Sequence, residues 1–327
     1  MLSRKKVFFF YLFLICVVVG VLIFLVRTDC TRNFIKNVKA QFSIFQKDNR
    51  IKIFFASDEN YAKYLCVAMT SILVNADKDD EFTFYILDGG LSSNSKTKIL
   101  QLKKIKNFKI EFISVNDEEF KKLPLGEFCF HVPRQTYYRY IIPVIKPRLK
   151  KVLYLDADIV VTGSLKELWN IDLEDNYVAV VEELHYSAPK DAKSLGVNYF
   201  FNAGVLLINN KLWQKDGIPD KLFKNTVNLY KQNLLRVNDQ SAMNYTFGEK
   251  VLYISPKYNL QQNAFYNGQH SRYTDEDMKV SIRKPLIIHF NGNIKPWHDN
   301  CEHAYKNLYF KYLLLSPYKT TGNNSHK

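Results

Sequence analysis

The stretch Ile51-Lys-Ile-Phe-Phe-Ala56, followed by Ser57-Asp-Glu-Asn60, opens the part of the chain that predicts a folded domain. A short apolar run that ends in turn-forming polar residues is typical of a buried β-strand. Residues 60–75 follow, with apolar side chains at helical spacing at Tyr64, Leu65, Ala68 and Ile72. These positions share one face of a helix, so the sequence predicts a strand followed by an amphipathic helix.

The same alternation continues along the chain. Residues 81–87 predict a second strand, residues 94–106 a basic amphipathic helix, and residues 108–115 a third strand. Strands that alternate with helices indicate an α/β fold, a mainly parallel sheet with helices on both faces. Further strand candidates are 151–155, 177–182, 204–209, 251–254 and 285–290. Ligands of such sheets bind beyond the carboxyl ends of the strands, so functional residues are expected just after these runs.

Composition narrows the class of protein. The 327 residues are 47% hydrophobic, enough for one sizeable domain. The net charge is +14, and residues 1–50 supply half of it, with nine Lys or Arg against two Asp. The other basic residues are scattered, without an Arg-rich helix or a zinc-finger or RNA-binding signature, so no nucleic-acid partner is predicted. The five cysteines are widely spaced and include no CxxC pair, which argues against a structural zinc site and a disulfide framework.

The N-terminus predicts a membrane anchor. Residues 1–6 form a basic head, and residues 7–26 are an uncharged apolar run of about 20 residues, the length of a membrane-spanning helix. A cleaved signal peptide is the rival interpretation, but the run ends at Leu25-Val-Arg27 without a small-residue cleavage site. Basic residues flank the run on both sides, so the orientation of the helix stays open. The membrane also stays open, either a bacterial inner membrane or a Golgi membrane.

The remaining boundaries follow from these elements. Residues 27–50 are predicted to be a polar stem, residues 51–318 the folded domain, and residues 319–327 a disordered tail. The segment 303–318 predicts a last amphipathic helix that Pro317 stops and that packs on the domain. No GxGxxG follows the first strand and no GxxxxGK[ST] occurs, which excludes a dinucleotide-dependent dehydrogenase and a P-loop NTPase.

Asp156-Ala157-Asp158 follows the apolar run 151–155 and is the first candidate site. Two carboxylates at the end of a buried strand suit a hard divalent cation, Mg²⁺ or Mn²⁺. The Asp-x-Asp pattern also occurs at 77–79 and 275–277, but there it lies in polar segments. Only the pair at 156 and 158 ends a buried strand, and it is therefore the predicted metal site.

His289 closes another apolar run, within Ile287-Ile-His-Phe-Asn-Gly-Asn-Ile-Lys-Pro-Trp297. An imidazole as third ligand would shift the preference from Mg²⁺ to Mn²⁺. Gly292 allows a ligand to approach the backbone closely, and Lys295 could pair with a phosphate. A strand-end turn whose histidine has ordinary hydrogen-bond partners explains the same residues, and the pattern alone leaves both interpretations open.

The chain as a whole resembles glycosyltransferase family 8, and within it the bacterial lipopolysaccharide α-1,4-galactosyltransferases. Five stretches carry the resemblance, in the order of the family, and they span roughly residues 51–315. They are Ala56-Ser-Asp-Glu-Asn-Tyr-Ala-Lys-Tyr-Leu-Cys-Val-Ala68, Tyr154-Leu-Asp-Ala-Asp158, Tyr199-Phe-Phe-Asn-Ala-Gly-Val-Leu-Leu-Ile-Asn209, Asn238-Asp-Gln240 and His289-Phe-Asn-Gly-Asn-Ile-Lys-Pro-Trp-His298.

The resemblance implies a GT-A fold, a nucleotide-diphospho-sugar transferase fold with a Rossmann-like mixed sheet. It also implies a UDP-hexose donor, galactose ahead of glucose, a glycan or glycolipid acceptor, and retention of anomeric configuration. The implied cofactor is Mn²⁺, with Mg²⁺ as the alternative, at Asp156, Asp158 and His289. The residues implied to bind the donor, with Tyr61 stacking on uracil, are Ala56, Asp58, Asn60, Tyr61, Arg139, Asp156, Ala157, Asn202, Gly292 and Lys295.

The implied catalytic residues are Asp239, Gln240 and Glu183, with Glu182 as the alternative to Glu183 for an acceptor-side acid. Gln240 is a neutral amide and a poor nucleophile, which favours departure and attack on one face of the sugar. Two departures, Ser241 for a carboxylate and Asn291 for a cysteine, leave the donor residues intact. A UDP-sugar-binding protein without transfer activity and a basic membrane-surface adaptor are the alternative functions.

Overall fold

The computed structural model of the protein describes residues 48–125, 134–265 and 272–319. The predicted head and anchor, nearly all of the stem and the tail from residue 320 lie outside the described residues. From Arg50 onward the chain forms one compact unit. Within the described ranges, no helix combines the length and the apolar character needed to cross a membrane.

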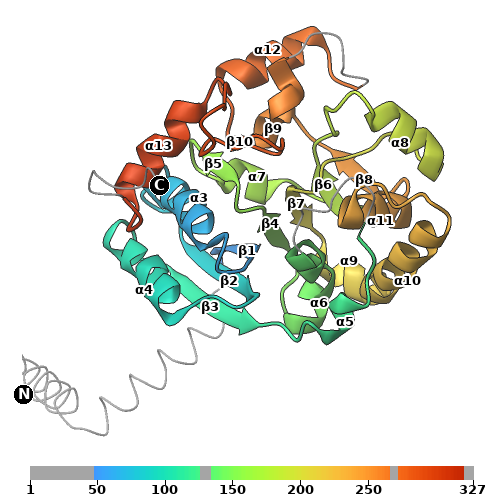
Figure 1. Ribbon diagram of the computed structural model, residues 1–327, viewed down its shortest axis with the longest axis horizontal. Coiled ribbons are helices and arrows are strands. Elements are labelled where there is room, and N and C mark those ends of the chain that lie inside the picture. The colour runs from blue at the N-terminus through green and yellow to red at the C-terminus, as the bar shows by residue number, and fades with distance from the viewer. Residues whose placement is uncertain (1–47, 126–133, 266–271, 320–327) are drawn as a thin grey trace, which may run out of the picture. The chain divides into compact units, whose positions relative to one another are not determined.

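The main sheet has seven strands in the order β3-β2-β1-β4-β7-β6-β8 (Figure 1). Strand β7 is antiparallel to both of its neighbours, and the other pairs are parallel, so the sheet is mixed. The strands are β1 Ile51–Ser57, β2 Phe82–Asp88, β3 Lys109–Ser114, β4 Val152–Leu155, β6 Val178–Val180, β7 Val205–Ile208 and β8 Val251–Tyr253.

The helices of the described residues are α3 Ala62–Val74, α4 Ser93–Gln101, α5 Glu118–Lys121, α6 Ile142–Ile145, α7 Lys166–Asn170, α8 Ala188–Leu195, α9 Asn210–Lys215, α10 Ile218–Lys231, α11 Asn238–Phe247, α12 Asp275–Arg283 and α13 Lys306–Leu315. Short 3-10 helices are η1 Leu102–Lys104, η2 Arg134–Ile141, η3 Pro256–Tyr258 and η4 Gln262–Phe265. Helices α3, α4 and α13 lie where the sequence predicts helices. Helices α9, α10 and α11 have no counterpart among the predicted elements, although α10 has buried residues at helical spacing, at Ile218, Leu222, Thr226 and Leu229.

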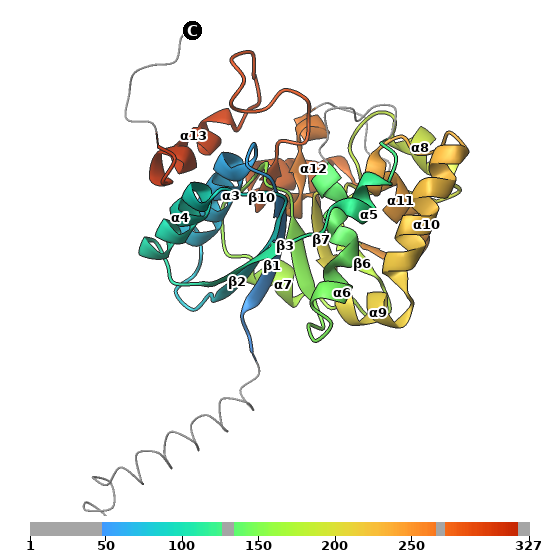
Figure 2. The same ribbon diagram turned by 60° about the horizontal axis from the view of Figure 1, so that its bottom comes forward.

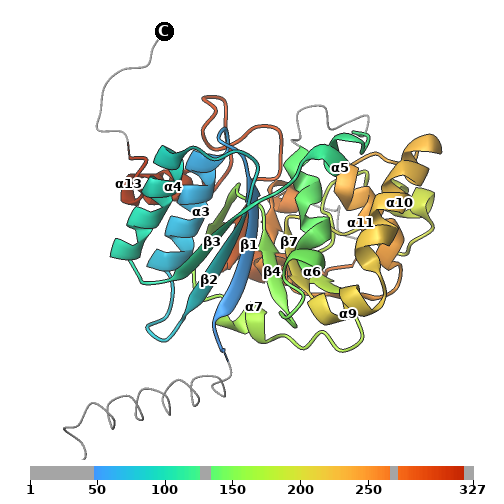
Figure 3. The same cartoon turned by 90° about the horizontal axis from the view of Figure 1, so that it is seen from below.

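Both faces of the sheet are covered. Ile53 and Phe55 of β1 belong to one buried core with residues of α3 and α4, whereas Phe54 belongs to a second core with residues of α10 and α11. Successive side chains of a strand point to opposite faces, so a strand buried on both sides reads as one continuous apolar run. Figures 2 and 3 show the sheet between α3 and α4 on one side and α6, α9, α10 and α11 on the other.

A second sheet of three strands has the order β5-β10-β9, with β5 Ile159–Val161, β10 Ile287–His289 and β9 Leu260–Gln261. The predicted strand 285–290 is therefore real, but it does not belong to the main sheet. Strand β4 already has β1 and β7 as neighbours, and β10 instead pairs antiparallel with β5.

The pairing of these strands brings distant polar segments together. Antiparallel pairing with β4 places the start of β7 at the end of β4, where the Asp156 amide donates to the Gly204 carbonyl at 2.8 Å. The end of β10 lies at the start of β5, where the Phe290 amide donates to the Asp158 carbonyl at 3.0 Å. Three segments far apart in sequence therefore meet at one place.

Candidate active site

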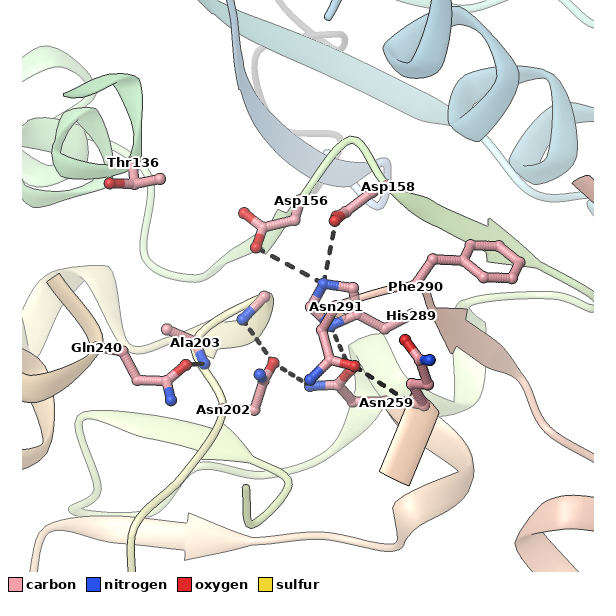
Figure 4. Close-up of polar contacts among 12 residues, drawn as sticks. Thr136, Asp156, Asp158, Asn202, Ala203, Gln240, Asn259, His289, Phe290 and Asn291 are labelled. Atoms are coloured by element: carbon pink, nitrogen blue, oxygen red, sulfur yellow. Dashed lines mark hydrogen bonds and ion pairs between the residues drawn. The ribbon is translucent and has the colours of Figure 1, made fainter. Parts of the chain in front are cut away.

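Asp156, Asp158 and His289 form the centre of the site. Each offers one ligand atom, and these atoms lie within 4.8 Å of one another. The Nε2 atom of His289 is 3.2 Å from Asp158 Oδ1 and 3.8 Å from Asp156 Oδ2 (Figure 4). Two carboxylates and one imidazole on a common centre are a donor set that fits a divalent cation such as Mn²⁺ or Mg²⁺.

Lys295 flanks this cluster on the side of Asp158. Its Nζ atom is 2.6 Å from Asp158 Oδ2 and donates to the Phe290 carbonyl at 2.7 Å. Burial acts to raise the pKa of Asp158, but the charge of the neighbouring Lys295 ammonium, the largest opposing cause, brings this pKa below its usual range. Asp158 is therefore ionised at neutral pH, as a metal ligand must be.

Arg139 flanks the cluster on the side of Asp156. Its side chain is buried, with Nη2 3.0 Å from Asp156 Oδ1 and Nε 3.1 Å from Asp239 Oδ2. Nη1 donates to the Ala203 carbonyl, and the guanidinium lies 4.1 Å from the centre of the Tyr154 ring. Burial acts to lower the pKa of Arg139, but the two carboxylates raise it above its ordinary value. Arg139 is thus a permanent, fixed cation.

Asp239, at the start of α11, contacts the site through Arg139. Burial raises the pKa of Asp239 to about 6, with Arg139 opposing this effect and the charge of Asp156 adding to it. The residue is 4% exposed. In the structure Asp239 therefore holds Arg139 in place, and the expectation that it lies at the reacting face of the sugar stays a prediction.

Gln240, Asn202 and Glu183 form a second polar group beside the cluster. Glu183 Oε2 accepts from Asn202 Nδ2 at 2.9 Å and from Gln240 Nε2 at 3.1 Å. Glu182, the alternative acid, instead lines a pocket of ≈ 270 Å³ against α8. The structure thus places Glu183, and not its neighbour, beside the predicted catalytic residue Gln240, because successive side chains point to opposite sides.

The segment expected to hold the nucleoside follows β1, which ends just beyond Ala56. Asp58 Oδ1 accepts from the Tyr61 amide at 3.0 Å, and Asp58 Oδ2 accepts from Asn60 Nδ2 at 3.2 Å. Burial raises the pKa of Tyr61, and the charges of Asp158 and Asp156 add to the effect. The segment therefore lies close to the candidate metal ligands, as a donor site for one nucleotide-sugar requires.

A stack of aromatic rings ties this segment to the loop after β10. Tyr61 lies edge-on to Tyr64 with ring centres 5.3 Å apart, and Tyr64 stacks on Trp297 at 3.6 Å and 10°. Trp297 belongs to the same loop as Lys295. The two predicted donor-binding segments thus support each other through packed rings.

Two predicted donor-binding residues have other neighbours in the structure. A side chain at Gly292 would collide with the Gln262 side chain, so this glycine makes room for packing within the protein. Ala157 is buried in the core beneath the two aspartates. Contact of Gly292 or Ala157 with the sugar-nucleotide donor stays a prediction.

Two residues that the sequence analysis did not single out complete the site. Asn259 is fully buried, and its Oδ1 lies 3.0 Å from His289 Nδ1. A Cβ atom on Gly204 would lie only 2.7 Å from the same Nδ1, so the ring needs a glycine there. Asn259 stands in no motif, and the strand that follows it, β9 Leu260–Gln261, is too short to be seen as a pattern in the sequence. Gly204 lies in the quoted Asn-Ala-Gly stretch, where its closeness to His289 could not be seen.

Comparison with known proteins agrees with this geometry. The profile of "Glycosyl transferase family 8" matches residues 52–301. A crystal structure of galactosyltransferase LgtC with donor and acceptor sugar analogues is similar at 32% identity and a TM-score of 0.73, covering 81% of this chain and 96% of that one. The sheet and helices are thus those of a GT-A-like fold.

Two curated relatives are also similar along most of their length. The lipopolysaccharide 1,2-glucosyltransferase of Escherichia coli is 30% identical over 80% of this chain and 77% of its own. The lipopolysaccharide 1,3-galactosyltransferase of Salmonella typhimurium (strain LT2) is 27% identical over 76% of this chain and 74% of its own. With a family profile that spans most of the folded part, the chain belongs to glycosyltransferase family 8 and is a glycosyltransferase.

Proposed function

We propose that the protein transfers a hexose, galactose ahead of glucose, from a UDP-sugar to a hydroxyl group of a glycan or lipopolysaccharide-type acceptor, with Mn²⁺ as cofactor and retention of anomeric configuration. The observation that carries the proposal is the convergence of Asp156, Asp158 and His289 between two fixed cations, Arg139 and Lys295. These three residues would hold the divalent cation, which would supply positive charge to offset the charge that develops on the diphosphate.

The chain's own cations divide the remaining work. The Lys295 ammonium is within reach of the cluster and can pair with a phosphate as a point charge. Arg139 is buried and donates to Asp156, to the Ala203 carbonyl and, from Nε, to the Thr136 carbonyl. Its Nε also lies 3.1 Å from Asp239 Oδ2. Arg139 therefore orients Asp156 and offsets the negative charge of the neighbouring carboxylates.

The acceptor side is assigned to Glu183 and Gln240. The Gln240 carbonyl accepts from the Ala203 amide at 2.9 Å, and its Nε2 donates to Glu183, so both ends of this side chain are held. Gln240 offers no carboxylate for a covalent intermediate. Its held carbonyl oxygen can stabilise positive charge on the sugar while the acceptor hydroxyl attacks the face from which UDP departs.

The nature of the two substrates rests on the relatives. LgtC and the Salmonella protein are named galactosyltransferases, and the Escherichia coli protein a glucosyltransferase, so a hexose donor is the common element. The two curated relatives are also named for lipopolysaccharide. These names support a hexose and a lipopolysaccharide-type glycan for this chain as well.

We also propose that residues 7–26 anchor the protein in a membrane as a single span. The support is the sequence itself, an uncharged apolar run of about 20 residues after a basic head. Carbonate extraction of membranes from expressing cells tests this part independently. Release of the full-length chain into the supernatant at alkaline pH would contradict it.

The test of the transfer activity is UDP release by the purified full-length chain, with Mn²⁺, from UDP-galactose, UDP-glucose and UDP-N-acetylglucosamine. We expect one hexose donor to be turned over, activity to stop with EDTA and to return with Mn²⁺, and D158N to be inactive. D79N is the matched control, since Asp79 belongs to another Asp-x-Asp stretch and is exposed. Mn²⁺-dependent UDP binding without turnover of any donor, with or without lipopolysaccharide acceptors, would favour a sugar-nucleotide-binding protein instead.

A further inference from the structure

A chain of side-chain hydrogen bonds runs from the candidate metal ligand His289 to the second polar group. His289 Nδ1 lies 3.0 Å from Asn259 Oδ1, and Asn259 Nδ2 donates to Asn202 Oδ1 at 2.9 Å. Asn202 Nδ2 in turn donates to Glu183 Oε2. Figure 4 shows His289, Asn259 and Asn202 one after another along this chain of contacts, with Asp156 and Asp158 on the side of the imidazole away from Asn259.

The direction of each bond in this chain follows from a backbone group. The Gly204 amide, which can only donate, lies 2.9 Å from the side-chain atom of Asn202 that also receives Asn259. That atom must be the Asn202 oxygen, so Asn259 presents its NH₂ group to Asn202 and its oxygen to His289. An oxygen cannot donate here, and therefore Nδ1 of His289 carries the proton.

The consequence reaches the metal site. A neutral imidazole with its proton on Nδ1 has its lone pair on Nε2, and Nε2 is the atom that faces Asp158 and Asp156. The opposite tautomer would set the Nδ1 lone pair against the Asn259 oxygen at 3.0 Å, in a place where Asn259 is fully buried. A buried contact between two acceptors is unfavourable. Asn259 thus selects the tautomer that can bind a cation.

The same backbone turn fixes the other end of the network. The Ala203 amide donates to Gln240 Oε1, so the Gln240 nitrogen must face Glu183. Adjacent amides of one turn therefore orient two side-chain amides, Asn202 towards the metal ligand and Gln240 towards the acceptor side. Asn259 is the link that joins His289 to this turn.

We propose that Asn259 is a positioning residue that sets the lone pair of His289 for metal binding and couples it to the Asn202–Glu183–Gln240 group. The inference rests on the proposed function for its metal and its reaction. Asn259 contacts neither substrate nor cation in this scheme and acts through His289 and Asn202. Partners of this kind on a ligating histidine are worth 10–100-fold in metal affinity or activity.

The experiment compares the full-length chain with N259A and N259D. In N259A the hydrogen bond to His289 and the hydrogen bond to Asn202 are both lost. In N259D an oxygen still accepts from His289 Nδ1, but the other carboxylate oxygen meets the Asn202 oxygen, so only the link to Asn202 is broken. Asn210 supplies the matched control, N210A, because it is also fully buried and donates only to the backbone carbonyls of Lys146 and Leu149.

Three quantities are measured. Long-range ¹⁵N–¹H spectra of EDTA-treated protein give the imidazole tautomer, with the His289 signal assigned by its loss in H289Q. Titration calorimetry gives the affinity for Mn²⁺ in the presence of UDP, and UDP release gives kcat. We expect a proton on Nδ1 in the wild type and in N259D, whether or not Nε2, which faces the two carboxylates, also carries one. In N259A we expect the proton on Nε2 alone, or a mixture of tautomers.

The affinity for Mn²⁺ is expected to fall 10–100-fold in N259A and to change less than about fivefold in N259D, whereas kcat falls in both. N210A is expected to keep tautomer, affinity and kcat. A wild type in which Nδ1 of His289 carries no proton, or unchanged affinity in N259A, overturns the inference; if N259A does not fold, the wild-type spectrum and N259D decide. A wild type that shows Nδ1–H but binds neither Mn²⁺ nor UDP contradicts the proposed function instead.

Discussion

Arg139 and Asp156 are joined by a 3.0 Å contact between Nη2 of the arginine and Oδ1 of the aspartate. Because Oδ1 is held in this way, Oδ2 is the oxygen of Asp156 that faces His289. The same guanidinium lies 3.1 Å from Asp239, so one buried cation serves two carboxylates of different function. The orientation of a candidate metal ligand and the stability of the core beneath it therefore depend on the same residue.

Replacing Arg139 by methionine is expected to destabilise the fold by about 3–5 kcal/mol, because it leaves two carboxylates without their buried partner. Since Asp239 is the more deeply buried of the two, the double variant R139M/D239N is expected to recover more than about 1 kcal/mol of this loss. Urea unfolding of the four members of the cycle measures the coupling. Strict additivity of the two substitutions would show that the contact has no energetic role.

Replacing Gly204 by alanine is expected to lower Mn²⁺ affinity at least tenfold, because the new methyl group would occupy the place of the His289 ring. G163A is the matched control, since its Cβ meets only a terminal methyl of Leu286, at 3.1 Å. Titration calorimetry with Mn²⁺ and UDP compares the two variants. Equal affinities would mean that the imidazole does not need its observed position.

Replacing Glu183 by glutamine is expected to reduce kcat by about 10²-fold or more, because a glutamine can no longer accept from both Asn202 and Gln240 without loss elsewhere. UDP affinity is expected to stay the same if Glu183 acts on the acceptor side, as we propose. E182Q is the neighbouring control and is expected to keep most of the activity. If E182Q proved the more damaging change, the assignment of the acceptor-side acid would have to be reversed.

Replacing Trp297 by alanine is expected to raise the KM for the donor about tenfold or more. The substitution removes the ring that stacks on Tyr64 at 3.6 Å and frees the loop that carries Lys295. W297F keeps a stacking ring and is expected to retain most of the donor affinity. Steady-state kinetics at saturating acceptor separates the two effects, and a change in kcat alone would argue against a role in holding the loop.

Stability is expected to fall as the pH drops from about 6.5 towards 4, in part because of His303. Burial lowers the pKa of His303 to about 4 from 6.5, so between these values the unfolded chain takes up a proton that the folded chain does not. The stability that neutral His303 contributes is fully present above pH 6.5 and is lost as the pH falls towards 4. H303F should reduce this loss by on the order of 1 kcal/mol, measured as the difference in Tm between pH 8 and pH 5.

Much of the fold could be predicted from local pattern. The runs at 51–56, 81–87 and 108–115 became β1, β2 and β3 of one parallel set. Strands β1 and β2 are buried on both faces and are therefore mostly apolar, whereas the edge strand β3 is half-buried or exposed along its length. The pattern did not show which strands share a sheet. The run at 285–290 looks like the others, yet it pairs with β5 and β9, since pairing is decided by long-range contacts.

The ligands of the candidate metal site were visible for a similar reason. Asp156, Asp158 and His289 all stand at the ends of apolar runs, where ligand-binding residues of an α/β sheet are expected. His289 reaches the two aspartates because β10 pairs antiparallel with β5, which starts directly after Asp158. Asn202 and Gly204 stand at the start of a strand, and only the antiparallel course of β7 brings them to the same place. The expectation that functional residues follow a strand does not identify Asn202 and Gly204, because both precede β7.

By itself the sequence determined the strand–helix order, the carboxylate pair and histidine of the candidate metal site, and the family, because each of these is written in adjacent residues. The tertiary structure alone decided that Glu183 and not Glu182 meets Gln240, that Arg139 lies buried between Asp156 and Asp239, and that Asn259 faces His289. These are contacts between segments 17–100 residues apart in the chain, in which direction and burial matter, and no periodicity of side chains records them.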